Sequence, residues 1–350
     1  MMKKTLIAAG VAVAMAVPMA ATADVQLSAQ QQVEVFNISG DPRDGNNMNG
    51  TGLYMGDAIE AGGNINSGNW SRVDLRASHD LGNGLTALAH IAANTNVTTG
   101  NALGGDREIN VGLRGDFGTV RFGRLTGAYA TAGKDPFNAT FMQARGNGGM
   151  IGGFGGLGNG AYFDQAIDYR GSFDMLSLAA TVAIDSSDED DSDSTNAEHA
   201  YALRANLNLN PVEVWAAYTN ADEYGMTGGG QTGAGQDFSA WKLGVEWSDG
   251  PIRVMAQYED ITHETAAGDD TDNAGQYIML AGTYRMGANT FMLGFGQFDA
   301  ENDADQRWMA LGMRHAFTRQ VSVHAGVRQT QYNDNDDKET AVGAGMRVVF

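Results

Sequence analysis

Residues 107–124 read REINVGLRGDFGTVRFGR, and this stretch decides the fold class. In its first half, apolar side chains at every second position alternate with polar ones: Ile109, Val111 and Leu113 against Glu108, Asn110 and Arg114. A period of two is typical of a β-strand with one apolar face. A turn signal at 116–118 then leads into a second short run at 119–124. The stretch therefore predicts an antiparallel hairpin.

The same alternation recurs along the chain and predicts an all-β protein of about sixteen strands, with no segment typical of a helix. The expected strands are 25–37, 70–78, 85–93, 108–117, 119–124, 166–173, 176–185, 199–208, 212–222, 238–248, 252–259, 275–285, 289–300, 305–317, 320–333 and 338–350.

The connections between these strands alternate in length. Tight turns are expected at 81–84, 116–118, 208–211, 248–251, 286–289 and 317–320. Longer connections are expected at 38–68, 95–106, 125–165, 185–198, 220–237, 259–274, 299–305 and 333–338. Short turns at one end and long loops at the other describe a transmembrane up-and-down barrel, whereas a soluble sandwich has Greek-key connections. An even number of strands places both termini on the periplasmic side.

The connection 125–165 is rich in glycine and nearly free of charge, and it contains GNGGMIGGFGGLGNG at 146–160. Loops of this length are uncommon and are usually functional or disordered. Inside a barrel, such a loop has an obvious use, which is to fold into the lumen and narrow it. We therefore expect 125–165 to be a constriction loop.

The first 23 residues are typical of a cleaved signal peptide. Lys3 and Lys4 precede a short apolar core at 6–17, Pro18 follows it, and Ala21-Thr22-Ala23 is an A-x-A cleavage site. The mature chain, 24–350, would then begin at Asp24 and form the barrel. The sequence predicts export.

Composition limits the possible ligands. The formal charge of −20 argues against nucleic acid as a partner. The chain has no cysteine, which removes disulfides and thiolate metal ligands. No apolar run approaches the ~20 residues of a transmembrane helix, a test that alternating barrel strands escape. We expect no cofactor and no metal.

Several stretches resemble the general porins of Gram-negative bacteria. WSRVDLRASHDLGNGLTALAHI at 70–91 and the stretch 107–124 are similar to two successive hairpins of that family. AIDY at 166–169 resembles the strand that follows the family's constriction loop, and the terminal Phe350 is shared. The resemblance implies an outer-membrane barrel of sixteen strands, usually a homotrimer, with its third long loop in the pore.

The last strand also resembles an insertion signal. Val342, Ala344, Met346, Val348 and Phe350 share one apolar face that ends on the final residue. Outer-membrane barrels that end in this way are recognised by the barrel-insertion machinery, which we expect as a partner together with outer-membrane lipid and lipopolysaccharide.

Charged residues of the strands are expected to face the lumen, because an arginine on the lipid face costs roughly 2–4 kcal/mol at the bilayer midplane. Five arginines opposite apolar faces then form a basic wall, which we call the arginine wall: Arg72, Arg76, Arg114, Arg121 and Arg170. The acids expected on the same wall are Asp74, Glu108 and Asp168. A solvated inner surface without a role in selectivity is the alternative.

The loop itself offers only Asp135 and Asp164, against Lys134 and Arg145, whereas the family commonly places several carboxylates there. Arg107 matches a pore arginine of the family, yet its parity places it with Ile109 on the apolar face. Either a bulge reverses its direction or it lies at the rim. Arg124 has the same parity problem and is expected to anchor the root of the loop.

The long connections are acidic, with runs at 188–191, 269–272, 299–305 and 334–339. They are either simply solvated, or a negative vestibule that attracts cations, or a place where divalent ions bridge to lipopolysaccharide. None has the spacing of an EF-hand.

Three other functions compete with a passive pore. The six histidines are scattered and give no catalytic constellation, so no catalytic residue and no enzyme is expected. A plugged structural or adhesive barrel and a substrate-specific channel remain alternatives. We predict a water-filled channel for passive diffusion of small hydrophilic solutes and ions in the outer membrane, with a weak cation preference suggested by the acidic composition.

Overall fold

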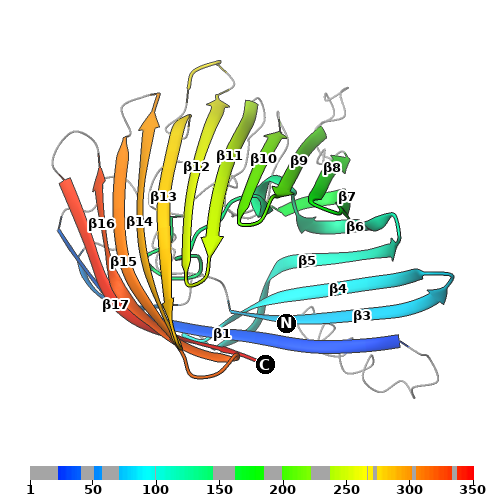
Figure 1. Cartoon of the computed structure of the whole chain (residues 1–350), viewed down its shortest axis with the longest axis horizontal. Coiled ribbons are helices and arrows are strands. Elements are labelled where there is room, and N and C mark those ends of the chain that lie inside the picture. The colour runs from blue at the N-terminus through cyan, green and yellow to red at the C-terminus, as the bar shows by residue number, and fades with distance from the viewer. Residues whose placement is uncertain are drawn as a thin grey trace.

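The computed structural model describes residues 23–40, 51–56, 71–98, 100–144, 162–184, 199–221, 237–265, 267–270, 274–301, 305–332 and 337–350. Nearly all of these residues lie in strands (Figure 1). The strands are β1 (Ala23–Gly40), β2 (Gly52–Gly56), β3 (Arg72–Gly82), β4 (Leu85–Asn96), β5 (Asn101–Gly115), β6 (Gly118–Thr126), β7 (Tyr162–Phe173), β8 (Leu176–Ile184), β9 (His199–Asn208), β10 (Val212–Asn220), β11 (Asp237–Asp249), β12 (Ile252–Glu264), β13 (Gly275–Met286), β14 (Asn289–Ala300), β15 (Gln306–Ala316), β16 (Val321–Tyr332) and β17 (Asp337–Val349).

The strands form one closed antiparallel barrel. Each strand from β3 to β17 pairs with the next in sequence, and β17 returns to pair with β1 through residues 339–349. On its other side, β1 pairs first with β3 through residues 23–30 and then with β2 through residues 34–38. Because β2 and β3 share one place beside β1, the 17 described segments occupy 16 positions of the barrel. This confirms the predicted sixteen-stranded fold.

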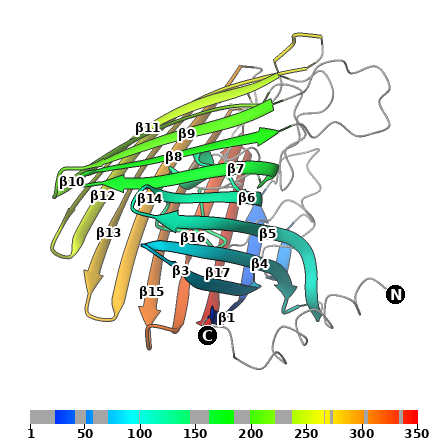
Figure 2. The ribbon, with the colours of Figure 1, turned by 90° about the vertical axis from the view of Figure 1, so that its right-hand side faces the viewer.

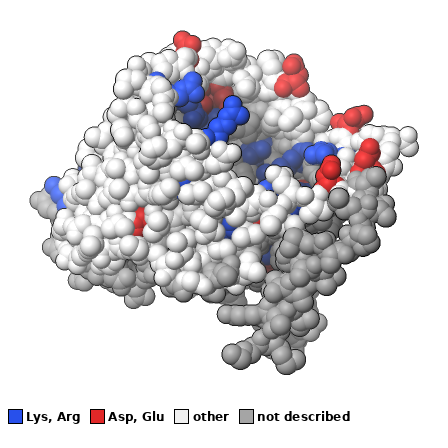
Figure 3. Space-filling model, turned by 90° about the horizontal axis from the view of Figure 1, so that it is seen from below, with Lys and Arg blue, Asp and Glu red and all other residues white. Residues whose placement is uncertain are grey.

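Alternation sorts side chains between the two faces of the wall. On β1, Glu34 and Phe36 are buried inside, while Val35 between them is exposed on the outer face. The register carries this parity around the barrel, so the exposed Leu, Ile, Val and Phe side chains form an apolar outer band. The outer surface carries few charges in the space-filling view, and Lys and Arg gather in the central hollow (Figure 3). This is the arrangement required of a barrel surrounded by lipid.

The short turns fall where the sequence predicts them. At the turn between β3 and β4, Asn83 and Gly84 both have positive φ, +51° and +76°. Two successive residues of this kind are typical of the type I′ turn that matches the twist of a two-residue hairpin. Figure 2, which shows the ribbon rotated by 90°, shows the strands tilted around the barrel wall.

Several predicted boundaries were wrong, and β12, for example, extends to Glu264 into the expected connection 259–274. The expected connection 38–68 contains β2, and the expected connection 95–106 contains the first part of β5. The strands β6 and β7 extend to Thr126 and back to Tyr162, so the connection between them is shorter than predicted. Within the described part of this connection, the only regular element is a single 3₁₀ turn, η1 (Tyr129–Thr131). No helix among the described residues is long and apolar enough to cross a membrane.

Candidate functional site

Residues 127–144, which we call the crossing segment, leave β6 and run through the barrel interior. The segment is visible in teal behind β10–β13 in Figure 1. Its first turn is held by β8 and β9: the backbone N–H of Ala128 donates to Thr181 Oγ1 at 2.9 Å, and Arg204 donates to the carbonyl oxygen of Thr131 at 3.0 Å. The remainder, 145–161, lies outside the described residues.

The middle of the crossing segment is held at Lys134. Gln257 on β12 accepts the backbone N–H of Lys134 at 2.8 Å through Oε1 and donates to its carbonyl oxygen through Nε2. The Lys134 ammonium lies 2.6 Å from Glu213 on β10 and 3.3 Å from Glu246 on β11. Both the backbone and the side chain of Lys134 are therefore fixed to the wall.

The second half of the segment is held by β1, β16 and β17. The carbonyl oxygen of Ala139 accepts hydrogen bonds from Gln32 at 2.7 Å and from Arg347 at 2.8 Å. The backbone N–H of Phe141 donates to Glu34 at 3.1 Å, and its carbonyl oxygen accepts from Arg328 at 3.1 Å. These partners satisfy backbone groups that would otherwise be buried without a hydrogen bond.

Glycines on the inner face make room for the apolar side chains of the segment. A Cβ at Gly294 would lie 2.7 Å from the ring of Phe137, and a Cβ at Gly312 would lie 2.9 Å from Met142 Sδ. Phe137 and Met142 are fully buried against these positions of β14 and β15. These contacts attach the segment to β8–β12, β14–β17 and β1.

The arginine wall lies on the inner face of β3–β7, and its acids are held beneath the guanidinium groups. Arg72 and Arg76 each lie 3.0 Å from the carboxylate of Asp74. The Asp74 side chain is only 8% exposed, whereas that of Arg76 is 49% exposed. His90 on β4 lies 2.9 Å from Asp74 and 3.2 Å from Glu108.

The second group of the wall repeats this pattern. Arg121 and Arg170 lie 2.7 Å and 3.0 Å from Asp168, which is fully buried and also accepts a hydrogen bond from Thr181. Arg114 is exposed and forms no ion pair with any described residue. In both groups the arginines are more exposed than the carboxylate that they share, Asp74 or Asp168.

Arg107 and Glu108 both reach the inner side because β5 carries a bulge. The register passes from Ile91 opposite Ile109 to Ala93 opposite Asp106, so two residues of β5 lie opposite one residue of β4. Arg107 donates to Asn94 Oδ1 at 3.0 Å, and Glu108 accepts the backbone N–H of Thr126 at 3.1 Å. Of the two alternatives predicted for Arg107, a bulge or a place at the rim, the structure shows the bulge. The role of Arg107 in the channel stays a prediction.

Arg124 lies at the two roots of the predicted loop. It is 2.6 Å from Asp164, at a second bulge in β7, and its guanidinium lies over the ring of Tyr162 at 4.8 Å. It also donates to the carbonyl oxygen of Arg107 at 3.0 Å. This set links the end of β6 to the start of β7.

The remaining predicted loop charges do not face the arginine wall as a set. Asp135 accepts the backbone N–H groups of Phe137 at 2.8 Å and Ala144 at 2.7 Å, so it holds a turn of the crossing segment. The Lys134 ammonium is paired with Glu213 and Glu246, which do not belong to the arginine wall. Arg145 and the acidic run at 188–191 lie outside the described residues, as do parts of the acidic runs at 269–272, 299–305 and 334–339.

Sequence reasoning missed the inner charges of the opposite wall: Glu34, Arg204, Glu213, Lys242, Glu246, Arg253, Glu259, Arg328, Glu339 and Arg347. Each has the parity of the inner face, and that signal was available. Their role was not, because it depends on contacts with a distant segment. Lys242, for example, is fully buried 3.6 Å from Glu259 and 3.9 Å from the ring centroid of Tyr129.

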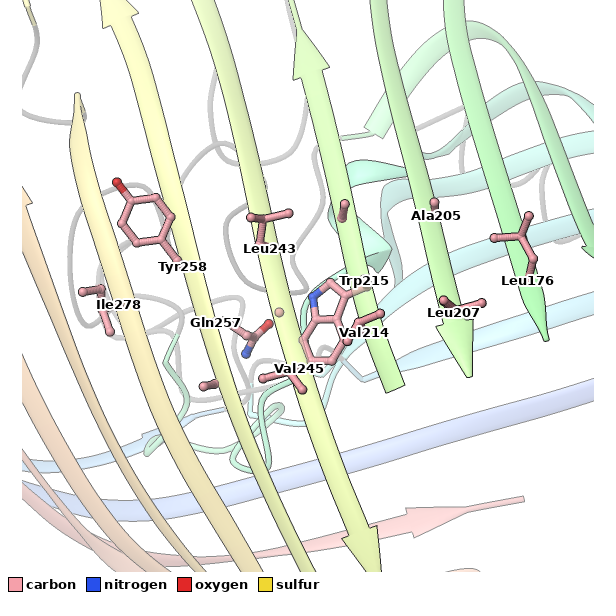
Figure 4. A pocket seen from close by; sticks show the side chains of 13 residues that line it. Leu176, Ala205, Leu207, Val214, Trp215, Leu243, Val245, Gln257, Tyr258 and Ile278 are labelled. Carbon is pink, nitrogen blue, oxygen red and sulfur yellow. The ribbon is translucent and has the colours of Figure 1, made fainter. Parts of the chain in front are cut away.

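A hollow of about 660 Å³ lies apart from this interior. It is a groove on the outer face of β8–β13, lined almost entirely by apolar side chains such as Leu176, Val214, Leu243 and Ile278 (Figure 4). No group of three or more His, Cys, Asp or Glu side chains in the described part of the chain is arranged to hold a metal ion.

Comparison with known sequences places this architecture among channels. A family model described as Gram-negative porin matches residues 8–336. The major outer membrane protein P.IB of Neisseria meningitidis serogroup B is 24% identical over an alignment of 381 positions that covers the whole of both chains. The P.IB protein of Neisseria gonorrhoeae is 35% identical over 126 residues, which cover 35% of this chain and 32% of that protein.

Solved structures share the fold. An anion-selective porin from Comamonas acidovorans superposes with a TM-score of 0.74 at 20% identity, covering 94% of this chain and 100% of that one. The trimer form of OmpT from Vibrio cholerae has a TM-score of 0.64 at 15% identity and covers 94% of this chain and 99% of its own.

Proposed function

This chain belongs to the Gram-negative porin family, and on that premise we propose that its channel favours small anions over small cations. It is a multi-pass outer-membrane β-barrel that forms a channel for passive diffusion, a channel rather than an enzyme.

The observation that supports anion preference is the unequal exposure of the inner charges. Asp74 and Asp168 are buried under their arginines, while Arg114 and the ends of Arg76 and Arg170 meet the water. Exposed positive charge in a confined cavity raises the local concentration of anions. The acidic composition suggested a weak cation preference, and the inner wall argues for the opposite sign. A structural relative is named an anion-selective porin.

The crossing segment would provide the constriction. Its described residues are attached to the wall from β8 around to β1, so the open path would lie between the segment and the arginine wall. A solute would then pass close to Arg72, Arg76, Arg121 and Arg170, with Arg107 and Glu108 at the bulge. This geometry would couple size exclusion to charge.

We also propose the assembly and processing that the sequence suggests. A signal peptide at 1–23 would be removed, which leaves the described strand β1 near the mature start. The barrel would form a homotrimer, as a structural relative in trimer form does. Its outer band would contact lipid and lipopolysaccharide, and Phe350 would serve the insertion machinery. We propose no cofactor, no metal and no enzymatic activity.

Planar-bilayer recording of the purified trimer tests the function. We expect open conductance steps in groups of three and a reversal potential of anion sign under a salt gradient. A reversal potential of cation sign would contradict the role given to the arginine wall. A folded barrel without conductance would contradict an open channel.

A further inference from the structure

The inner face of β1 and β3–β6 contains a pocket of about 360 Å³ near the turn end of these strands, separate from the crossing segment. The pocket is lined by Asp24, Gln26, Arg76, Ala77, Ser78, Leu88, Ala89, His90, Asn110, Arg114 and Arg121. We propose that it binds a small dianion of the inorganic phosphate type. The inference rests on the proposed function, because the ligand reaches the pocket through the channel.

The strand register explains why a hollow forms here. Ser78, Leu88, Gly112 and Arg121 lie side by side in one row across β3–β6. Gly112 has no side chain, and a Cβ there would lie 3.0 Å from Arg121 Cγ. The row is therefore low at Gly112 and at Ser78, which lie on either side of Leu88, and the Arg121 side chain lies next to Gly112.

Arginines from three adjacent rows surround these low positions. Arg76 lies in the neighbouring row, opposite His90, and Arg114 lies in the row on the other side, opposite Thr119. Arg114 and Arg121 are diagonal neighbours across β5 and β6, a relation that places side chains roughly 7–8 Å apart. Long side chains at that spacing can converge on one ligand.

One arginine of the pocket has donors free for an anion. Arg76 and Arg121 are each paired with a buried carboxylate from outside the lining, Asp74 and Asp168. Arg114 is exposed and has no ion-pair partner among the described residues, so its N–H donors are free. The lining also contains the exposed carboxylate of Asp24, opposite Ser78, which balances the formal charge, so the case for an anion rests on the free donors of Arg114.

The chemistry of guanidinium groups identifies the class of ligand. An arginine presents a planar fork that binds phosphate or carboxylate oxygens in a bidentate manner. The amide groups of Gln26 and Asn110 add neutral donors on the same side. The free fork of Arg114, with the remaining N–H groups of Arg76 and Arg121, suits a compact anion with several oxygens better than chloride.

The test measures chloride current through the channel while sodium phosphate replaces part of the sodium chloride at constant ionic strength and alkaline pH. We expect the wild-type current to fall along a saturating curve. R114Q is expected to raise the half-blocking phosphate concentration about tenfold, which is the effect of losing one charged hydrogen bond.

Arg314 supplies a matched control. It is exposed on the inner face near the turn end of β15, opposite His324, and it lies outside the pocket. R314Q removes the same charge, and we expect it to change the half-blocking concentration less than R114Q by a wide margin. Equal shifts in the two variants would replace a site with a general effect of net charge and overturn the proposal.

A second variant separates binding in the pocket from the general electrostatic effect of net charge. S78L fills the low position at Ser78 without changing charge, so we expect weaker block by phosphate and an unchanged reversal potential in sodium chloride. Unchanged phosphate block in S78L would also overturn the site. Because chloride conductance is recorded in every variant, a channel that conducts but shows no saturable block refutes the pocket and leaves the channel function standing.

Discussion

Gln257 binds both backbone groups of one residue, Lys134: its Oε1 accepts the N–H at 2.8 Å and its Nε2 donates to the carbonyl oxygen. A primary amide carries an acceptor oxygen and a donor NH₂ group side by side, so it can accept and donate in this paired manner. The backbone direction of the crossing segment is thereby set at its midpoint by a single residue of β12.

Replacing Gln257 should loosen the crossing segment without unfolding the barrel. In Q257A both backbone groups of Lys134 lose their partner, and we expect larger and noisier single-channel currents. Q276A is the control, because Gln276 is an exposed glutamine at the end of the neighbouring β13. Identical current noise in the two variants would show that Gln257 does not position the segment.

The buried pair Lys242 and Glu259 should be costly to break from one side. K242M leaves the carboxylate of Glu259 buried without its cation, and we expect a loss of about 3–5 kcal/mol in the free energy of unfolding. The double variant K242M/E259M should recover much of that loss. Urea unfolding in lipid vesicles measures both, with the exposed K338M as control. A double variant as unstable as K242M would contradict this account.

Gly312 should tolerate a side chain only if Met142 becomes smaller. A Cβ at Gly312 would lie 2.9 Å from Met142 Sδ, so G312A overpacks the contact between β15 and the crossing segment. We expect a loss of about 1–3 kcal/mol in the free energy of unfolding. The same overpacking should increase single-channel current noise in G312A, and the smaller side chain in the double variant G312A/M142A should reduce that increase. An equal increase in noise in both variants would argue against the contact.

Arg124 and Arg170 should differ in their effect on ion selectivity. Arg124 is engaged with Asp164 and Tyr162 at the roots of the loop, whereas Arg170 lies on the arginine wall. R170Q should shift the reversal potential toward cations, and R124Q should shift it less. The reversal potential under a salt gradient decides this, and a larger shift in R124Q would place Arg124 in the ion path.

The period of two was sufficient to predict the barrel and the parity of most inner residues, because each strand has one face toward lipid. It failed at Arg107, where one extra residue in β5 changes the register without any local sign in the composition. It also missed β2, a five-residue strand inside a long connection.

The anchors of the crossing segment could not be read from the sequence for a different reason. Gln257 and Lys134 are 123 positions apart, and Glu34 and Phe141 are 107 apart. Nothing in either local pattern specifies the partner. Parity shows that Gln257 faces inward, and only the three-dimensional course of residues 127–144 shows what it binds.

The pairing of β1 with β17 has a consequence for folding kinetics. Residues 30–40 meet residues 339–349, so the contact that closes the ring joins positions about three hundred residues apart in the chain. Contacts of such high sequence separation form slowly, and until they form both strands present unpaired edges. The seam between β1 and β17 is therefore where the last and slowest step of assembly should occur, and where an incomplete barrel would be most prone to aggregate.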